Sequence, residues 1–333
     1  MPNLTPYQRA YLRFKMRLSV RTFFESSGYI EVDTPILVVS PGTETYLRYF
    51  ETAWFDHRQK PIRRYLRSSP EIHMKQLLSE SLPKIFQIAP CFRNYGEFSD
   101  WHHPEFALLE WYESNLSFEN FMQQTEDFLQ YSANFMETHL DHCGIDSSFC
   151  KKKISLHRLT VSDAFHEFVG ISLEDGDPSL AAKAVDKGIL SVRPGDDFET
   201  AFFKILLECV EPNIARIGPT ILYDYPPSQA ALSLVRHGVA KRCEVYIGRI
   251  EISNGFEELA DPEENKARYF ASMEQRRSLG FEIPDLDPHF IDALGKQFPP
   301  SCGQALGLDR WLAIICNLPQ VGPLIPFRDH FEP

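Results

Sequence analysis

Apolar residues recur at helical spacing near the start of the chain and predict a helix over residues 5–27. Thr5 is the expected N-cap, Gln8 completes a capping box with it, and Gly28 ends the element. The apolar stripe consists of Leu12, Met16, Val20, Phe23 and Phe24. Basic residues lie mostly off this stripe, so we expect them to form a solvated face: Arg9, Arg13, Lys15, Arg17 and Arg21.

Strand patterns follow this helix. Residues 29–33 alternate between apolar and polar side chains and stop at Thr34-Pro35. Two aromatic-rich runs, 85–92 and 106–113, are joined by a polar loop and predict a long-looped antiparallel hairpin. Further strands are predicted at 220–225, 244–247 and 249–252, the last two turning at Gly248.

Serine, aspartate and proline residues mark the starts of further helices. Ser68-Ser69-Pro70-Glu71 predicts a serine-capped helix that runs to about Ser79. Asp261-Pro262 predicts a second capped helix, which ends at Gly280. The remaining helical patterns are 117–210, read as mainly helical, and the apolar segment 311–316.

This alternation of elements indicates the fold class. Antiparallel hairpins interleaved with helices indicate an α+β fold rather than a doubly wound parallel sheet. The chain contains no long Pro/Gly linker that would separate independent domains. We therefore expect a single domain over residues 1–333, with a mainly helical insertion at about 115–215.

Composition and charge narrow the class of protein. Of the 333 residues, 43% are hydrophobic and 24% are charged, which is enough to build a buried core. There are 46 acidic residues against 34 lysines and arginines, and the resulting net charge of −12 disfavours a long nucleic-acid footprint. Seven scattered cysteines without a Cys-x-x-Cys pair argue against a disulfide framework or a zinc site. No apolar run approaches about 18 residues, so we expect a cytoplasmic protein.

Three polar clusters are candidates for chemistry. The first is Phe92-Arg93-Asn94 at a predicted strand end, and the second is Arg310 at a helix start that two glycines precede. The third lies on one hairpin and its exit: Glu244, Glu251, Asn254, Glu257 and Glu258. Each cluster alone also fits a structural role, because ion pairs and solvated acids produce the same patterns. The adjacent His102-His103 pair has no third ligand at metal spacing, so we expect loop packing there.

The order and spacing of these clusters resemble the class II aminoacyl-tRNA synthetases. The first helix, the strand and Thr34-Pro35 resemble motif 1, and Phe92-Arg93-Asn94 with Pro104-Glu105-Phe106 resembles motif 2. Gly307-Leu308-Asp309-Arg310 resembles motif 3, and residues 251–259 are similar to the lysyl-tRNA synthetase branch. Other segments resemble a truncated paralogue family, the elongation factor P lysine ligases: Ser69–Leu78, Leu109–Tyr112, Glu211–Ile214 and Tyr225–Ala230.

The resemblance implies a reaction and a set of site residues. ATP would adenylate a lysine-type amino acid, preferentially (R)-β-lysine, and the acyl group would pass to a lysine of elongation factor P. Arg93 would bind the α-phosphate and the substrate carboxylate, whereas Arg310 and Phe106 would sandwich the adenine. Glu244 and Glu251 would hold Mg²⁺. The implied ATP-binding set is Arg93, Asn94, Tyr95, His103, Phe106, Glu251, Ile252, Gly307 and Arg310, with Arg93 and Arg310 as the catalytic pair. The implied amino-acid pocket is Ser69, Glu71, Tyr112, Asn254, Glu258 and Ala305.

The loop of motif 2 departs from the family pattern. Tyr95 stands where a glutamate is usual, His103 stands where an asparagine is usual, and Asp100 lies where a basic residue is usual. Glu97 could supply the missing carboxylate. These changes are either harmless variation or a cause of weaker activation.

Two alternatives to a protein ligase remain open at this stage. A tRNA-directed paralogue would need an anticodon-binding β-barrel before motif 1, but motif 1 begins almost at Thr5, so a tRNA partner is disfavoured. A non-catalytic paralogue that binds lysine or ATP would be expected to lack the arginines or the metal-binding acids. Motif 1 also implies a homodimer.

Overall fold

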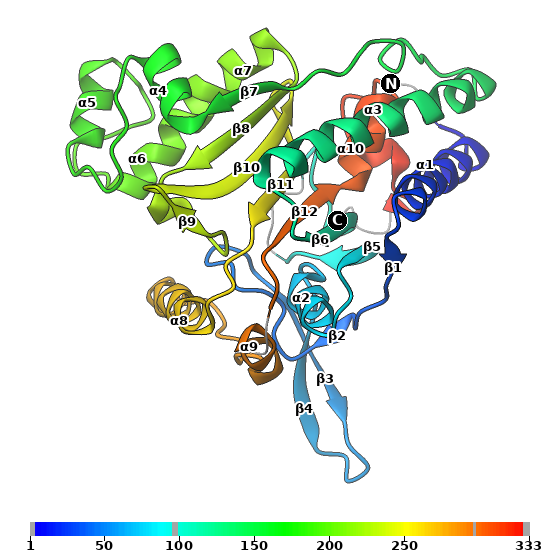
Figure 1. Cartoon of the computed structure of the whole chain (residues 1–333), viewed down its shortest axis with the longest axis horizontal. Helices are drawn as coiled ribbons and strands as arrows, with labels where there is room; N and C mark the ends of the chain where they lie inside the picture. The colour runs from blue at the N-terminus through cyan, green and yellow to red at the C-terminus, as the bar shows by residue number, and fades with distance from the viewer. Residues whose placement is uncertain (1–3, 95–98, 296–297, 329–333) are drawn as a thin grey trace. The chain divides into compact units, whose positions relative to one another are not determined.

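The computed structural model describes residues 4–94, 99–295 and 298–328 of the chain (Figure 1). The chain divides into two compact units. The first unit is made of Met1–Ser117, Asp127–Lys153 and Ala260–Pro333, and the second is made of Phe118–Glu126 and Ile154–Leu259. The expected helical insertion at about 115–215 therefore contributes to both units.

Four paired strands form the main sheet of the first unit. Strands β5 (Lys84–Phe92) and β6 (Glu105–Ser114) form the predicted antiparallel hairpin, with Cys91 opposite Phe106. Strand β1 (Ile30–Glu31) pairs with β5 in parallel, and β12 (Ser301–Gly307) pairs antiparallel with β6. This register carries the ends of motifs 2 and 3 to neighbouring strands.

The N-terminal helix has the predicted cap. Helix α1 (Pro6–Ser26) begins after Thr5, whose N–H donates to Gln8 Oε1 at 2.9 Å, while Gln8 N–H donates to Thr5 Oγ1 at 3.2 Å. Four of the five expected stripe residues are buried, namely Leu12, Met16, Val20 and Phe24, whereas Phe23 is partly exposed. The capping box and the apolar spacing are confirmed.

The basic face of this helix is not simply solvated, and this part of the expectation is wrong. Arg13 forms an ion pair with Asp309, and Arg9 Nε donates to the carbonyl oxygen of Pro323 at 2.8 Å. Arg21 pairs with Glu31 at 2.7 Å. Arginine side chains are long enough to cross apolar surface and reach partners that sequence spacing does not reveal.

The other helices of the first unit follow their sequence punctuation in most respects. Helix α8 (Pro262–Ser278) is capped as predicted, because Glu264 N–H donates to Asp261 Oδ1 at 2.8 Å. Helix α2 (Glu71–Ser79) starts where expected, but Pro70 is its N-cap and no serine side chain caps it. The remaining helices are α9 (Pro288–Gly295), α10 (Leu308–Ile315) and the short η3 (Gly322–Leu324).

A second, three-stranded sheet in this unit is absent from the sequence prediction. It is formed by β2 (Leu37–Val38), β4 (Pro61–Leu66) and β3 (Phe50–Phe55) in that order. The β3–β4 hairpin projects from the other elements of the unit (Figure 1), and nearly all residues of β3 are exposed. A strand without a buried face has no alternating pattern from which it could be predicted.

The second unit is a sheet covered by short helices. Strand β10 (Val239–Ile247) pairs antiparallel with β8 (Thr220–Tyr225), β9 (Val235–Arg236) and β11 (Ile250–Glu257), and β7 (His157–Thr160) pairs in parallel with β8. The predicted turn at Gly248 is confirmed, and its backbone is left-handed, with φ +63°. The helices are α4 (Val161–Val169), α5 (Leu180–Asp186), α6 (Phe198–Ile205), α7 (Glu211–Ile217), the π-helical turn Leu206–Val210 and the short η2 (Pro227–Gln229).

Helix α3 (Phe118–His142) begins in the second unit and continues in the first. In the second unit, Phe165 and Phe202 stack with ring centroids 5.2 Å apart and share a core with Leu222 and Tyr246. This core fixes β8 and β10, which carry several polar side chains discussed below. Among the described helices, none combines the length and apolar character needed to cross a lipid bilayer.

Candidate active site

Arg93 lies directly after strand β5, at the position where the hairpin opens into its loop. Its N–H donates to the carbonyl oxygen of Pro104 at 3.0 Å, and its guanidinium carbon lies 5.1 Å from the centre of the Phe106 ring. Its Nε is buried and has no hydrogen-bond partner among the described residues. A buried guanidinium nitrogen without a partner is costly unless a ligand supplies an acceptor, so Arg93 has the properties of an anion-binding residue.

Arg310 lies in the first turn of α10 and contacts the loop of motif 2. Its Nε donates to the carbonyl oxygen of Trp101 at 3.2 Å, and Nη2 lies 2.7 Å from His102 Nε2. His102 in turn places Nδ1 2.8 Å from the hydroxyl of Ser99. The structure therefore brings the motif 3 arginine to the motif 2 loop, and His102 is a contact that the sequence analysis did not identify.

The other loop residues have mixed outcomes. His103 is buried and its Nδ1 lies 2.6 Å from the carbonyl oxygen of Glu105, so both histidines of the pair take part in loop packing. Asn94 N–H donates to the carbonyl oxygen of Arg48 at 2.9 Å. Asp100 is exposed. The predicted residues Tyr95 and Glu97 lie outside the described residues.

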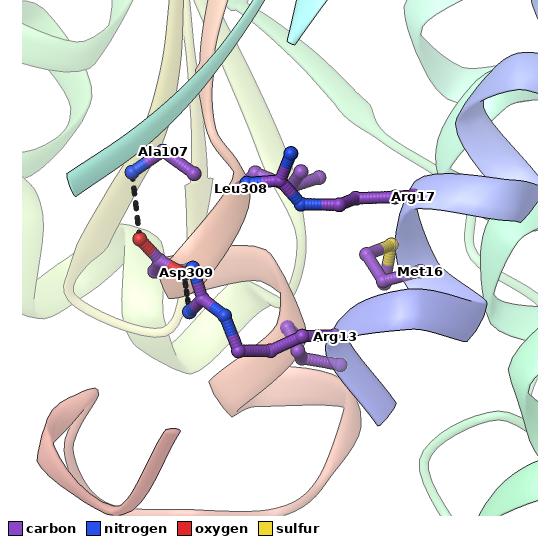
Figure 2. Close-up of a pocket in the computed structure, with 7 residues that line it drawn as sticks. Arg13, Met16, Arg17, Ala107, Leu308 and Asp309 are labelled. Carbon is purple, nitrogen blue, oxygen red and sulfur yellow. Dashed lines mark hydrogen bonds and ion pairs between the residues drawn. The ribbon is translucent and has the colours of Figure 1, made fainter. Parts of the chain in front are cut away.

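Asp309 joins three elements of the first unit beside Arg310 (Figure 2). Its Oδ2 accepts the backbone N–H of Ala107 on β6 at 2.7 Å, and its Oδ1 accepts the side chain of Arg13 on α1. Arg17, one turn further along α1, lines the same small pocket, and burial lowers the pKa of its guanidinium. Gly307, the N-cap of α10, leaves 3.4 Å between its ideal Cβ position and Arg310 Cδ. The Asp309 carboxylate thus fixes the start of the helix that carries Arg310.

We expect Asp309→Asn to lower the free energy of unfolding by about 2 kcal/mol, because the Arg13 guanidinium loses its anionic partner in a largely buried pair. Because the Arg13 side chain is partly exposed to solvent, the loss of stability should be smaller than for a fully buried ion pair. Chemical denaturation followed by fluorescence measures the loss. Asp100→Asn, at an exposed acid, is the matched control and should unfold like the parent chain. Equal stability of Asp309→Asn and the parent would contradict a tethering role.

The residues predicted for the amino-acid pocket separate by unit. In the first unit, Tyr112 is buried and its hydroxyl donates to Glu110 Oε2 at 3.0 Å, while Ala305 lies opposite Glu110 on the paired strand. Ser69 Oγ accepts the N–H of Glu71 at 3.3 Å. These positions lie on β6, β12 and the start of α2.

Glu71 already has a cationic partner in the fold. Its Oε1 lies 2.7 Å from Nζ of Lys75, which is one turn further along α2 and 2% exposed. Sequence analysis identified Glu71 but not Lys75, although the i, i+4 spacing of opposite charges was visible. The pairing compensates part of the charge that Glu71 would offer to a substrate ammonium.

In the second unit, Glu244 is buried in a polar cluster. Its Oε1 accepts Arg242 Nη2 at 2.5 Å, and its Oε2 accepts the hydroxyls of Tyr225 at 2.6 Å and Tyr246 at 2.7 Å. Burial alone would lower the pKa of Arg242, but the adjacent Glu244 carboxylate raises it overall. Burial, reinforced by the negative charge of Glu244, raises the pKa values of Tyr225 and Tyr246 well above 10. The sequence did not reveal that Arg242, Tyr225 and Tyr246 contact Glu244.

The other predicted residues of this unit lie on β11 or just beyond it. A bulge between Val245 and Tyr246 places Glu251 opposite Tyr246, and Asn254 lies opposite Glu244. Asn254 Oδ1 is buried and lacks a hydrogen-bond partner among the described residues. Ile252 is buried on the same strand, and Glu258 is buried where it forms an isolated bridge with Ser233.

Glu211, at the start of α7, is electrostatically coupled to these acids. The pKa of Glu211 is raised to about 7: burial is the main cause, the positive charge of Arg249 opposes it, and the negative charges of Glu244 and Glu251 reinforce it. The sequence analysis quoted Glu211 as part of a family segment without assigning it a role. Its acidic neighbours are brought close only by the pairing of β10 with β11, which sequence spacing does not reveal.

The arrangement of Glu244 and Glu251 can be compared with what a magnesium site requires. The residues that the structure describes contain no group of three or more His, Cys, Asp or Glu side chains arranged to enclose a metal ion. Magnesium usually takes only one or two carboxylates from a protein and completes its shell with phosphates and water. An ionised carboxylate can accept about four contacts, and Glu244 uses three of them for Arg242, Tyr225 and Tyr246. The remaining one, together with the carboxylate of Glu251, fits such an open site. The donor set therefore suits a cation held jointly with nucleotide phosphates.

Comparisons with known proteins support one family. The family pattern of the class II tRNA synthetases (D, K and N) matches residues 4–330. A protein of Hamiltonella defensa named elongation factor P–(R)-β-lysine ligase is 33% identical over 328 residues, covering 97% of this chain and 95% of the relative. Proteins with the same name from Haemophilus influenzae and Salmonella gallinarum are each 32% identical, covering 95% of this chain and 93% of each relative.

The match spans both structural units and every motif from which the family was inferred. The structure also has the α+β architecture that the sequence predicted; its antiparallel strands carry motif 2 and, on a strand that was not predicted, motif 3. The chain belongs to the class II tRNA synthetase family and, within it, to the group of its ligase relatives.

Proposed function

We propose that this protein is a ligase that activates a lysine-type amino acid, (R)-β-lysine, with ATP and transfers it to a lysine side chain of elongation factor P. The observation that carries the proposal is similarity along nearly the whole chain to relatives named for that reaction. The partly buried Arg93, with Nε available for an anion and its guanidinium over Phe106, supplies supporting chemistry.

The activation step needs positioning and charge neutralisation more than proton transfer. The substrate carboxylate is already ionised and attacks the α-phosphorus of ATP, the bond to the bridging oxygen breaks, and pyrophosphate leaves with the electron pair. Arg93 binds the α-phosphate and the carboxylate through its planar guanidinium. It stabilises the negative charge that builds up on the α-phosphate oxygens.

The nucleotide base and the terminal phosphates are assigned to other residues. Phe106 offers a ring face to adenine, and Arg310 contributes a second cation from the start of α10. Glu251, together with Glu244, would hold Mg²⁺, which neutralises phosphate charge when it is bound. Asn94, Tyr95, His103, Ile252 and Gly307 complete the proposed ATP site.

The transfer step passes the acyl group from the adenylate to an amine. The lysine nitrogen of elongation factor P attacks the acyl carbon, AMP leaves with the electron pair, and the ammonium loses one proton to solvent. Glu71 and Glu258 would bind the two substrate ammonium groups, with Ser69, Tyr112, Asn254 and Ala305 as neighbours. The homodimer and the cytoplasmic location remain part of this proposal.

The activity test uses the whole protein with ATP, magnesium, (R)-β-lysine or α-lysine, and elongation factor P. We expect intact-mass spectrometry to show one added lysyl group on the factor and ATP–pyrophosphate exchange that depends on the amino acid. Exchange without transfer to the factor, but with transfer to tRNA, would favour the tRNA-directed alternative. Absence of both exchange and mass addition with either isomer would favour a non-catalytic paralogue and reject the proposal.

A further inference from the structure

Glu44 lies in a loop of the first unit, between β2 and β3, that is attached to the start of the amino-acid pocket. The hydroxyl of Ser68 donates to the carbonyl oxygen of Pro41 at 2.8 Å, and Ser68 N–H donates to the same oxygen at 3.2 Å. Ser68 directly precedes Ser69, which is assigned to the pocket. The loop is therefore held beside the residues proposed to bind the amino acid.

The Glu44 carboxylate is folded back over Gly42. An ideal Cβ on Gly42 would lie 2.2 Å from Glu44 Oε2 and 2.8 Å from Ser68 Oγ, so no other residue fits at position 42 without displacing this carboxylate or the serine. The Glu44 side chain can occupy this position because Gly42 has no side chain.

Arg276 holds the backbone around Glu44 through hydrogen bonds. The Nη1 atom of this fully buried arginine donates to the carbonyl oxygens of Glu44 at 2.7 Å, Thr45 at 3.1 Å and Leu47 at 2.6 Å. A loop held by three such bonds presents its side chains in one geometry, which is what a recognition residue needs.

The Glu44 carboxylate has little compensation of its own. Within the described ranges, its carboxylate accepts a long hydrogen bond from the Tyr49 hydroxyl at 3.3 Å and one from its own backbone N–H, and it forms no ion pair within 4 Å. Burial raises the pKa of Glu44, the positive charge of Arg93 opposes this, and the negative charge of Glu71 adds to it. Glu44 is therefore close enough to Arg93 and Glu71 for their charges to change its pKa, but among the described residues no cationic group forms an ion pair with it.

We propose that Glu44 is a specificity-determining residue that joins Glu71 in binding the substrate ammonium nearest the reacting carboxylate. The inference rests on the proposed function. Arg93 would hold the carboxylate, and in a β-amino acid the nearest ammonium lies two carbons away from it. Glu71 is already paired with Lys75, whereas a substrate ammonium would give Glu44 its missing cation. A charge-assisted hydrogen bond here would select amino acids that carry this amine.

The test compares Glu44→Gln with Glu51→Gln, an exposed glutamate on β3, in ATP–pyrophosphate exchange. For Glu44→Gln we expect KM for (R)-β-lysine to rise by about 10- to 100-fold, the range for loss of one charged hydrogen bond, while KM for ATP changes less than about twofold. Glu51→Gln should match the parent. Glu44→Asp, which keeps the charge but shortens the side chain, should lie between.

A probe that lacks the amine separates recognition from general damage. 6-Aminohexanoate carries the carboxylate and the distal ammonium of lysine but no ammonium near the carboxylate, so its inhibition constant should be the same for the parent and Glu44→Gln. Equal loss of affinity for 6-aminohexanoate and (R)-β-lysine, or an unchanged KM for (R)-β-lysine, would overturn the assignment. If the parent protein shows no exchange with any lysine isomer, the proposed function itself fails.

Discussion

Replacement of Arg93 by alanine is expected to lower the rate of ATP–pyrophosphate exchange by about 10³-fold. The guanidinium would stabilise charge that develops on the α-phosphate, and that interaction is stronger in the transition state than in the ground state. Among the residues that the structure describes, Arg93 Nε has no hydrogen-bond partner. The variant should therefore lose only the contact with the Phe106 ring, which is worth about 1 kcal/mol of stability. Exchange kinetics and a thermal melt measure the two effects.

Arg93→Lys is the informative companion to the alanine variant. Lysine keeps a positive charge but cannot bind phosphate and carboxylate oxygens in a planar, bidentate way. We expect its exchange rate to lie between those of the parent and Arg93→Ala. An alanine variant with full activity would remove Arg93 from the reaction, and a lysine variant as active as the parent would show that charge alone is needed.

Glu244→Gln is expected to destabilise the protein by about 3 kcal/mol. The carboxylate is 6% exposed, pairs with Arg242 and accepts two tyrosine hydroxyls, so a neutral side chain leaves the arginine charge uncompensated in a buried setting. The amide also has an NH₂ group where the fold requires acceptors. Chemical denaturation should show a lower midpoint with an unchanged slope.

Glu251→Gln is the matched variant on the neighbouring strand. It lies opposite Tyr246 but belongs to the proposed metal-binding pair, so we expect the variant to keep the parent's stability and lose most ATP–pyrophosphate exchange. The two variants then separate the contribution of Glu244 to the stability of the fold from the contribution of Glu251 to activity. If Glu244→Gln were as stable as the parent, its pairing with Arg242 would not support the fold; full exchange in Glu251→Gln would remove Glu251 from the metal site.

Local sequence patterns predicted the elements whose signals are local. The capping box of α1, the Asp261 cap of α8 and the β5–β6 hairpin depend on residues a few positions apart, or on a continuous apolar run, and all are confirmed. Nearly all of β3 is exposed, β4 fully buries only Tyr65, and β7 is only four residues long. The β3–β4 hairpin and β7 were missed because an exposed strand or a very short one leaves too weak a pattern of apolar residues in the sequence.

The candidate site shows the same division. Arg93, Arg310 and Glu251 were predicted as site residues because family motifs mark them, but the side chains that contact them could not be predicted. His102 meets Arg310 across 208 positions, and Glu44 approaches Arg93 through a loop whose place is set by Arg276. Such contacts depend on how distant segments pack, which neither spacing nor composition encodes.

The Asp309 junction has a consequence for the order in which the protein acquires activity. Its partners Ala107 and Arg13 are 202 and 296 positions away in the chain, so closing both contacts requires most of the first unit to have come together. Contacts of such long range form slowly compared with helices and hairpins. We therefore expect Arg310 to reach its final position late in refolding, after the circular dichroism signal of the helices has already recovered.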